Sequence, residues 1–159
     1  MRQPFAILFL LLPVAALLAA CGRGGPAPAT ATLAASTVAT ATVGGATLQA
    51  SSVAIANLDP TVAARYGFDR SHDGALLLVT LRDANGEAIA PGDLRLTASA
   101  SVPPDPPRPL ELQRIEVGSL TDYVGVFPAR PPASVQFRVT ATRGGARTEL
   151  TTTAELYPR

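Results

Sequence analysis

The feature that most constrains the fold is a series of short segments in which apolar and polar residues alternate, separated by turn residues, between residues 48 and 159. Residues 93–102 show the pattern most clearly, because every second residue is small or apolar and would lie on one side of a strand. Asn-Gly at 85–86 and Gly-Gly at 144–145 are typical of tight turns between strands. We therefore predict an all-β domain, an antiparallel immunoglobulin-like β-sandwich of about seven strands.

One short helical turn is expected among these strands. Residues 61–66 form it, with Asp59 as N-cap, Pro60 at the first helical position and Gly67 as the left-handed residue that ends it. The strongly apolar residues 75–82 predict a central strand buried on both faces. The expected strands are residues 48–57, 75–82, 93–102, 110–117, 123–127, 134–142 and 147–157. The expected core contains Leu76, Leu78, Leu96, Leu112, Val126, Phe127, Phe137, Val139 and Leu150.

The first 20 residues have the features of a secretory signal peptide: a charged start at Arg2, an apolar run over 5–18 and small residues after it. The run is shorter than the roughly 20 residues of a membrane-spanning helix, which disfavours the alternative of an uncleaved membrane anchor. Residues 18–21 (Leu-Ala-Ala-Cys) resemble the lipobox of bacterial lipoproteins. The resemblance implies cleavage before Cys21, a diacylglyceryl thioether on its sulfur and acylation of the new amine.

The residues after Cys21 predict where the anchor holds the protein and how far the domain extends from it. Gly22 stands where lipoproteins kept in the inner membrane often carry Asp, so the resemblance favours the periplasmic face of the outer membrane. Residues 22–47 are almost entirely Ala, Thr, Gly, Pro, Ser and Val, which bury too little surface to offset the entropy of ordering. We predict a signal peptide over 1–20, the lipidated cysteine with a disordered tether over 21–47, and the β-sandwich over 48–159.

Charge and cysteine content exclude several classes of function. The chain has 13 Lys plus Arg, all of them arginine, and 12 Asp plus Glu. Removal of Arg2 with the signal peptide leaves 12 of each sign, which gives no electrostatic attraction to nucleic acid. The absence of lysine excludes Schiff-base chemistry, and the single cysteine excludes an intrachain disulfide.

Three blocks of residues resemble a known family. The pattern of domain of unknown function 4426 is similar to three consecutive parts of this chain: residues 58–67 (Leu-Asp-Pro-Thr-Val-Ala-Ala-Arg-Tyr-Gly), then Arg70 and Ser71, then the apolar strand from residue 75. The spacing of residues 123–127, the Phe137 strand and the closing Leu-Tyr also fits, so the resemblance covers about residues 48–159. It implies a β domain exported by Gram-negative bacteria. It implies no activity, because none is established for the family, and the lipobox departs from its plain secretory signals.

The densest polar cluster is Arg70, Ser71, His72 and Asp73, which includes the only histidine. A Ser-His-Asp triad needs side chains that converge from separated positions, and neighbouring residues on one segment point in different directions. We therefore expect no catalytic residue here. Arg70 is expected to pair with a carboxylate or with carbonyls at the helix end; the alternative is that Tyr66 and Arg70 bind a ligand at one end of the sandwich.

The remaining candidate features receive structural interpretations. No calcium-binding loop pattern is present, and we expect Asp69, Asp73 and Asp83 to be solvated turn residues, with no metal and no cofactor. The prolines of residues 103–109 are expected to form a rigid loop at a sheet edge, and a polyproline II docking segment is the alternative.

These observations predict a non-enzymatic module of the cell envelope, bound to the membrane by the lipid on Cys21. The stable anchor, the tether and the lack of catalytic residues favour contact with another periplasmic protein. The alternative is a carrier or sensor that holds a small ligand between the sheets or at a loop end.

Overall fold

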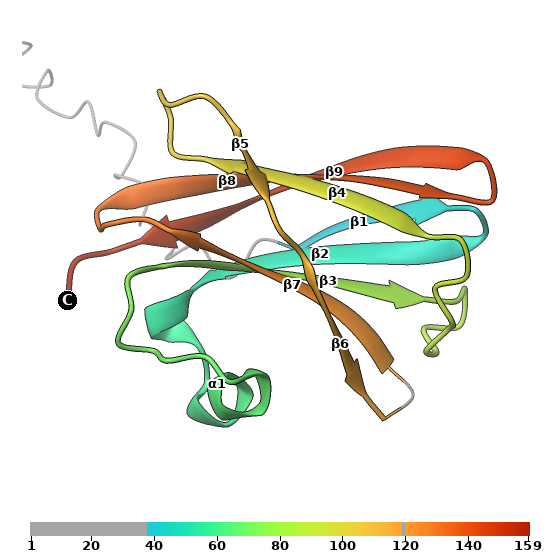
Figure 1. The fold of residues 1–159 in the computed structure, drawn as a ribbon, viewed down its shortest axis with the longest axis horizontal. Helices are drawn as coiled ribbons and strands as arrows, with labels where there is room; N and C mark the ends of the chain where they lie inside the picture. The colour runs from blue at the N-terminus through green and yellow to red at the C-terminus, as the bar shows by residue number, and fades with distance from the viewer. Residues whose placement is uncertain (1–37, 119) are drawn as a thin grey trace, which may run out of the picture. The chain divides into compact units, whose positions relative to one another are not determined.

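The computed structural model describes residues 38–118 and 120–159, which form two antiparallel sheets packed face to face (Figure 1). One sheet has the strand order β1-β2-β3-β7-β6 and the other the order β5-β4-β8-β9. This arrangement confirms the predicted all-β antiparallel sandwich, with nine strands in the described residues instead of about seven. The strands are β1 (Val38–Val43), β2 (Ala46–Ala54), β3 (Gly74–Arg82), β4 (Arg95–Ser101), β5 (Arg108–Leu110), β6 (Gln113–Val117), β7 (Leu120–Pro128), β8 (Ala133–Arg143) and β9 (Ala146–Leu156).

The connection between β2 and β3 contains both helical elements, a 3-10 turn η1 (Ile55–Asn57) and the helix α1 (Pro60–Tyr66). The expected helix is therefore confirmed at both ends. Asp59 accepts hydrogen bonds from two backbone N–H groups of the first turn, and Gly67 takes the left-handed conformation with φ 72°. α1 lies on the side of the five-stranded sheet that faces away from the four-stranded sheet (Figure 1). In the described residues no helix is long and apolar enough to span a bilayer.

Strand β1 corrects the predicted boundary between tether and domain. Residues 38–47 were expected to be disordered, but β1 and the first residues of β2 form a hairpin around Gly44 and Gly45, both with positive φ. Val43 is fully buried, and the small side chains of the strand pack against the main core. Pairing with β2 satisfies the backbone, so Ala and Thr suffice in this strand although their composition resembles a linker. Cys21 and the rest of the expected tether lie outside the described residues.

The main core lies between the sheets, and β3 has buried side chains on both of its faces, as predicted. Leu77 and Val79 point inward and are fully buried, so Leu76 and Leu78 point to the outer face, where α1 and its neighbours cover them. Val126 was also expected in the core but is 40% exposed on that outer face. Four of the expected core residues are buried between the sheets: Phe127, Phe137, Val139 and Leu150. Leu96 and Leu112 are partly buried and pack against this core.

One expected strand is divided between the two sheets. Residues 110–117 were predicted as a single strand, but β5 ends at Leu110 and pairs with β4, while β6 begins at Gln113 and pairs with β7. The chain therefore crosses from one sheet to the other at residues 111–112. Leu110 and Leu112 pack closely beside Gly125 of β7, where a Cβ atom would come within 2.8 Å of the Leu110 side chain. An alternating sequence cannot reveal such a crossing, because both halves keep the same period.

Candidate functional site

The outer face of the five-stranded sheet carries a second apolar cluster, separate from the main core. Its buried members come from η1 and the residue after it, from α1, and from strands β3 and β7: Ile55, Leu58, Ala63, Leu76 and Val124. Antiparallel register places one row of side chains across four strands on this face, in the order Val38, Ser51, Leu78 and Val124. α1 does not cover the whole row, since Val38, at its β1 end, is 53% exposed.

A groove of about 300 Å³ lies between α1 and this row. Its residues are uncharged and mostly apolar: Val38, Gln49, Ser51, Ser52, Val53, Leu58, Val62, Tyr66, Leu76, Leu78 and Val124. Val38, at the β1 side, is 53% exposed, and the Gln49 side chain is exposed at the rim. The groove therefore offers an apolar surface to solvent on the outer face of the five-stranded sheet.

Tyr66 lines the groove and is anchored by a carboxylate on the sheet. Its hydroxyl donates a hydrogen bond of 2.9 Å to Oδ2 of Asp122, which lies on β7 and is only 6% exposed. Its ring stacks with Phe68, with ring centroids 6.3 Å apart. Partial burial raises the pKa of the Tyr66 hydroxyl above its usual value, and the hydrogen bond to Asp122 acts in the same direction. Tyr66 therefore fixes the end of α1 to the sheet and forms one wall of the groove.

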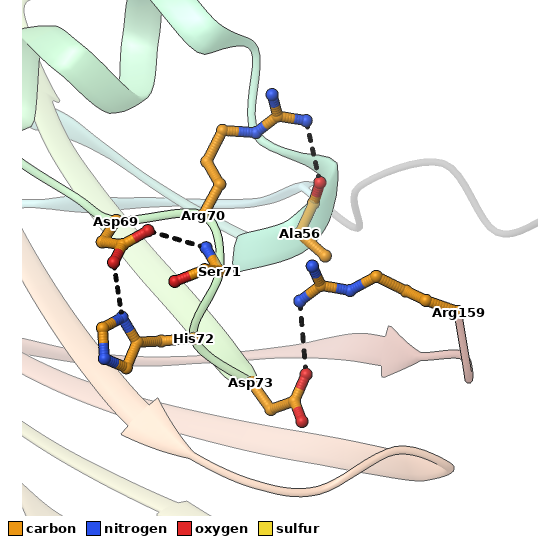
Figure 2. A network of polar contacts seen from close by, with 7 residues as sticks. All are labelled: Ala56, Asp69, Arg70, Ser71, His72, Asp73 and Arg159. Carbon is orange, nitrogen blue, oxygen red and sulfur yellow. Dashed lines mark hydrogen bonds and ion pairs between the residues drawn. The ribbon is translucent and has the colours of Figure 1, made fainter.

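Arg70 is not among the groove residues, so the structure does not bring it together with Tyr66 in one pocket. Its Nη2 donates a hydrogen bond of 3.0 Å to the carbonyl oxygen of Ala56 in η1 (Figure 2). Its Nε is buried without a hydrogen-bond partner among the described residues. The hydrogen bond joins the loop after α1 to η1, the turn that precedes α1. Arg70 therefore does bond a backbone carbonyl, as expected, but this carbonyl belongs to η1 and not to the end of α1.

The polar cluster beside Arg70 is organised around Asp69. The backbone N–H of Ser71 donates to Asp69 Oδ1 at 2.8 Å, and His72 Nδ1 lies 3.3 Å from Asp69 Oδ2 (Figure 2). The hydrogen bonds from the Ser71 backbone and hydroxyl lower the pKa of Asp69. Asp73 points the other way, toward the guanidinium of Arg159 at 3.2 Å. The side chains of His72 and Asp69 are 76% and 62% exposed, so this cluster is a solvated turn without the burial that strengthens catalytic groups.

The structure also places the proline-rich residues 103–109 and the acidic residues considered as metal ligands. The prolines of residues 103–109 begin in a turn after β4, and Pro109 lies in β5, an edge strand of its sheet. In the part of the chain that the structure describes, no three His, Cys, Asp or Glu side chains come close enough to hold a metal ion.

The sequence reasoning missed the groove and two polar residues that join segments far apart in the sequence. Asp122 is a carboxylate on an outward position of an apolar strand, which is a detectable signal, but its partner is 56 residues away. Arg143 of β8 was also missed; its Nη1 donates to the carbonyl oxygen of Gly44, and so ties the β8–β9 hairpin to the β1–β2 hairpin. Neither pairing has a signature in local sequence.

Comparisons with known proteins agree with this architecture. A solved structure of a DUF4426 family protein from Pseudomonas aeruginosa PAO1 is similar to this chain, with a TM-score of 0.57 and 18% sequence identity. The match covers 77% of this chain and 96% of the other, and it supports the fold alone. No curated protein matches. The sequence profile of DUF4426, a domain of unknown function, matches residues 40–159, so the chain belongs to the DUF4426 family.

Proposed function

We propose that this chain is a lipid-anchored protein of the bacterial cell envelope, without enzymatic activity, whose sandwich binds a periplasmic protein partner. The signal-peptide pattern and the lipobox-like residues ending at Cys21 support attachment by lipid. Gly22 supports the periplasmic face of the outer membrane as the location. The solvated arrangement of Ser71 and His72 around Asp69 supports a non-catalytic role for the polar cluster.

The groove between α1 and the outer face of the five-stranded sheet is the observation that carries this proposal. Apolar surface left in water costs about 25 cal/mol for each Å², and exposed apolar patches with polar rims are typical of interaction sites. The groove contributes little to closing the main core, which is completed by fully buried residues such as Leu77 and Val79. Burial of its uncharged lining by a partner would stabilise a complex without desolvating any charge.

Site-specific photocrosslinking in intact cells tests the groove as the binding surface. A photoreactive residue at Gln49 lies at the groove, and the same residue at Thr151 lies exposed on the four-stranded sheet as a matched control. We expect a discrete adduct from position 49 only, weakened by Val62→Asp in the groove and unchanged by Thr61→Asp on the exposed side of the same helix. Equal adducts from both positions, or no effect of Val62→Asp in a folded variant, would contradict the proposal.

The anchor is tested separately from the sandwich. Metabolic labelling with a radioactive fatty acid should label the wild-type chain and fail with Cys21→Ser, and the variant should leave the membrane fraction. Outer and inner membranes separated on a density gradient then show which one holds the labelled protein. A Cys21→Ser form that is still labelled would refute the assignment of Cys21 as the lipid acceptor.

A second function, binding of a small apolar ligand, is favoured by the size of the same groove. Its volume of about 300 Å³ is at the lower end of ligand pockets, and its lining is apolar with a few polar groups at the rim. This site would lie on the outer face of a sheet and not between the two sheets. Native mass spectrometry of protein purified from its own envelope distinguishes the two functions, because a carrier would retain a ligand that Val62→Asp removes.

A further inference from the structure

Strand β9, red in Figure 1, is an edge strand of the four-stranded sheet. In the residues that the structure describes it pairs with β8 alone, and its 11 residues keep an uninterrupted register with that strand. The opposite edge of the same sheet is β5, which has three residues, one of them proline. Short edge strands, prolines, lysines and bulges prevent sheets of different molecules from pairing, and β9 has none of these. β9 therefore has the length and regularity to accept another strand.

Alternate residues of β9 direct their backbone groups away from β8. The turn of Gly144 and Gly145, both with positive φ, joins Arg143 of β8 to Ala146 of β9. In a two-residue turn of this kind the flanking residues are a hydrogen-bonded pair. Such pairs alternate along an antiparallel ladder, so Ala146 and every second residue after it bond to β8. The N–H and C=O groups point to the open edge at residues 147, 149, 151, 153 and 155.

The side chains of these residues lie on the outer face of the sheet. Leu150 and Ala154, which alternate with them, are buried in the main core and hold β9 in place. The central residues 150–154 are uncharged, with Arg147 before them and Glu155 after them. Among the described residues Arg147 forms no ion pair. The edge therefore has an uncharged centre and opposite charges toward its two ends.

This order of charges matches a second copy of the same strand. Antiparallel pairing about a two-fold axis at Thr151 sets Arg147 of each copy opposite Glu155 of the other. Opposite residues on one face have Cβ atoms about 4.5–5.5 Å apart, which is within reach of an ion pair. An axis at Thr152 would instead set Glu149 opposite Glu155, and like charges directly opposite are destabilising. Charge therefore selects the register with its axis at Thr151.

We infer that two copies of this chain pair through residues 147–155 of β9 about a two-fold axis at Thr151, so that their four-stranded sheets join into one continuous sheet. The outward backbone groups supply about ten hydrogen bonds between the copies. Arg147 and Glu155 form an ion pair at each end of the contact. None of the groove residues lies on β9, so this dimer does not depend on the proposed function.

Charge reversal tests the register in the chain from residue 21 onward with Cys21→Ser. Sedimentation equilibrium should show the mass rising from one chain to two at about 1–100 µM, because the contact is small. Arg147→Glu alone and Glu155→Arg alone each bring like charges together and should weaken the dimer about tenfold or more. An equimolar mixture of these two variants should dimerise again, because each opposing pair is then one Glu and one Arg. Arg114→Glu, on the edge strand β6 of the other sheet, is the matched control and should change nothing.

Three results of this experiment would overturn the inference. The first is a wild-type mass of one chain throughout the concentration range. The second is a pair of single variants that dimerise as well as the wild type. The third is a mixture that stays monomeric although each variant keeps the circular dichroism of the wild type.

Thr151→Cys in the full chain gives a second readout in intact cells. The two-fold axis sets the two introduced thiols opposite each other, with Cα atoms about 5.5 Å apart, which suits a disulfide. A species of twice the chain mass should therefore appear on a non-reducing gel. Thr97→Cys, exposed on β4 of the same sheet, should give none. No such species from position 151, equal amounts from both positions, or a crosslink to a different protein would overturn the inference.

The dimer and the groove can fail separately. A photoreactive residue at position 151 should join two copies of this chain, so only adducts with a different protein count in its comparison with position 49. A retained adduct from position 49 without the β9 dimer would contradict this inference alone. A β9 dimer without any adduct from position 49 would contradict only the proposed function.

Discussion

Tyr66→Phe removes one hydroxyl group and leaves the ring of the groove wall in place. In the wild-type protein this hydroxyl donates to Asp122, a carboxylate that is 6% exposed, at 2.9 Å. The substitution therefore leaves a buried acceptor without that donor, while the contact with Phe68 is kept. Hydrogen bonds to charged groups contribute about 1.5–3 kcal/mol, and partial solvent access at Tyr66 favours the lower end. We expect a loss of about 1.5 kcal/mol in the free energy of unfolding.

Thermal and urea denaturation measure this loss, and a double-mutant cycle assigns it. For a domain of this size we expect the Tm to fall by about 5 °C. Asp122→Ala should be destabilising by itself, and the double variant should be less destabilised than the sum of the two, by about 1 kcal/mol. A Tm unchanged by Tyr66→Phe, or a cycle that is additive, would refute the argument that this hydrogen bond holds α1 on the sheet.

The hydrogen-bonded pair of Tyr66 and Asp122 also predicts how the free energy of unfolding changes at alkaline pH. The pKa of Tyr66 is raised in the folded state by burial and by Asp122, so the folded protein binds more protons than the unfolded chain near and above pH 10. The stabilising contribution is complete below the unfolded pKa and is lost as the pH rises through the raised folded pKa. The free energy of unfolding should therefore fall more steeply above pH 10 in the wild type than in Tyr66→Phe.

Three other substitutions test the hairpin, the core and the helix cap. Gly44→Ala should lower the free energy of unfolding by about 1–3 kcal/mol in urea, because its Cβ would meet the Arg143 carbonyl oxygen at 2.5 Å and its φ is +51°. Leu77→Ala should cost about 2–5 kcal/mol, whereas Val126→Ala should stay within about 0.5 kcal/mol. Asp59→Ala should reduce the protection of backbone amides in α1, measured by hydrogen exchange. The pKa of Asp59 is lowered chiefly by the backbone N–H groups that it caps. The cap therefore stabilises the folded protein above the unfolded pKa of Asp59, and this contribution is lost as the pH falls through the lowered folded pKa.

Each of these substitutions has a matched control, and each has a result that would contradict its reasoning. Gly45→Ala meets no atom within 4 Å, so it should cost less than Gly44→Ala, and the reverse order would contradict the steric argument. If Val126→Ala costs as much as Leu77→Ala, the assignment of inner and outer faces is wrong. Arg65→Ala, in the last turn of α1, leaves the Asp59 cap intact, so an equal loss of protection in α1 would argue against the cap.

Most of the strands and the helix could be predicted because their signals are local. Asp59, Pro60 and Gly67 each act on the backbone within one helical turn, so their effect does not depend on what the helix packs against. β1 was missed for the opposite reason. Its Ala and Thr residues have little burial of their own, and the strand exists because β2 supplies partners for its backbone and the main core receives Val43. The Gly-Gly pair at 44–45 was the available signal for that hairpin.

The site depended on contacts that no local pattern contains. Residues 75–79 are apolar at every position, so the alternation that would distinguish the two faces is absent, and the sequence could not assign Leu76 and Leu78 to the outer cluster instead of the main core. The groove exists because β2 and β3 are joined by a connection that places α1 over the outer face. Tyr66 could be identified as a candidate residue from the family-like block of residues 58–67, but its partner Asp122 could not.

The sequence by itself determined the class of the fold and the helix with its caps, because each of these follows from periodicity or from residues within one turn of chain. The tertiary structure alone decided which face of β3 meets the core, which sheet receives each half of residues 108–117, and where an apolar groove stays open to solvent. Those outcomes depend on which strands pair and pack together, and not on residues within one turn of chain. Their free energy comes from surfaces that come together only when both sheets and α1 are in place.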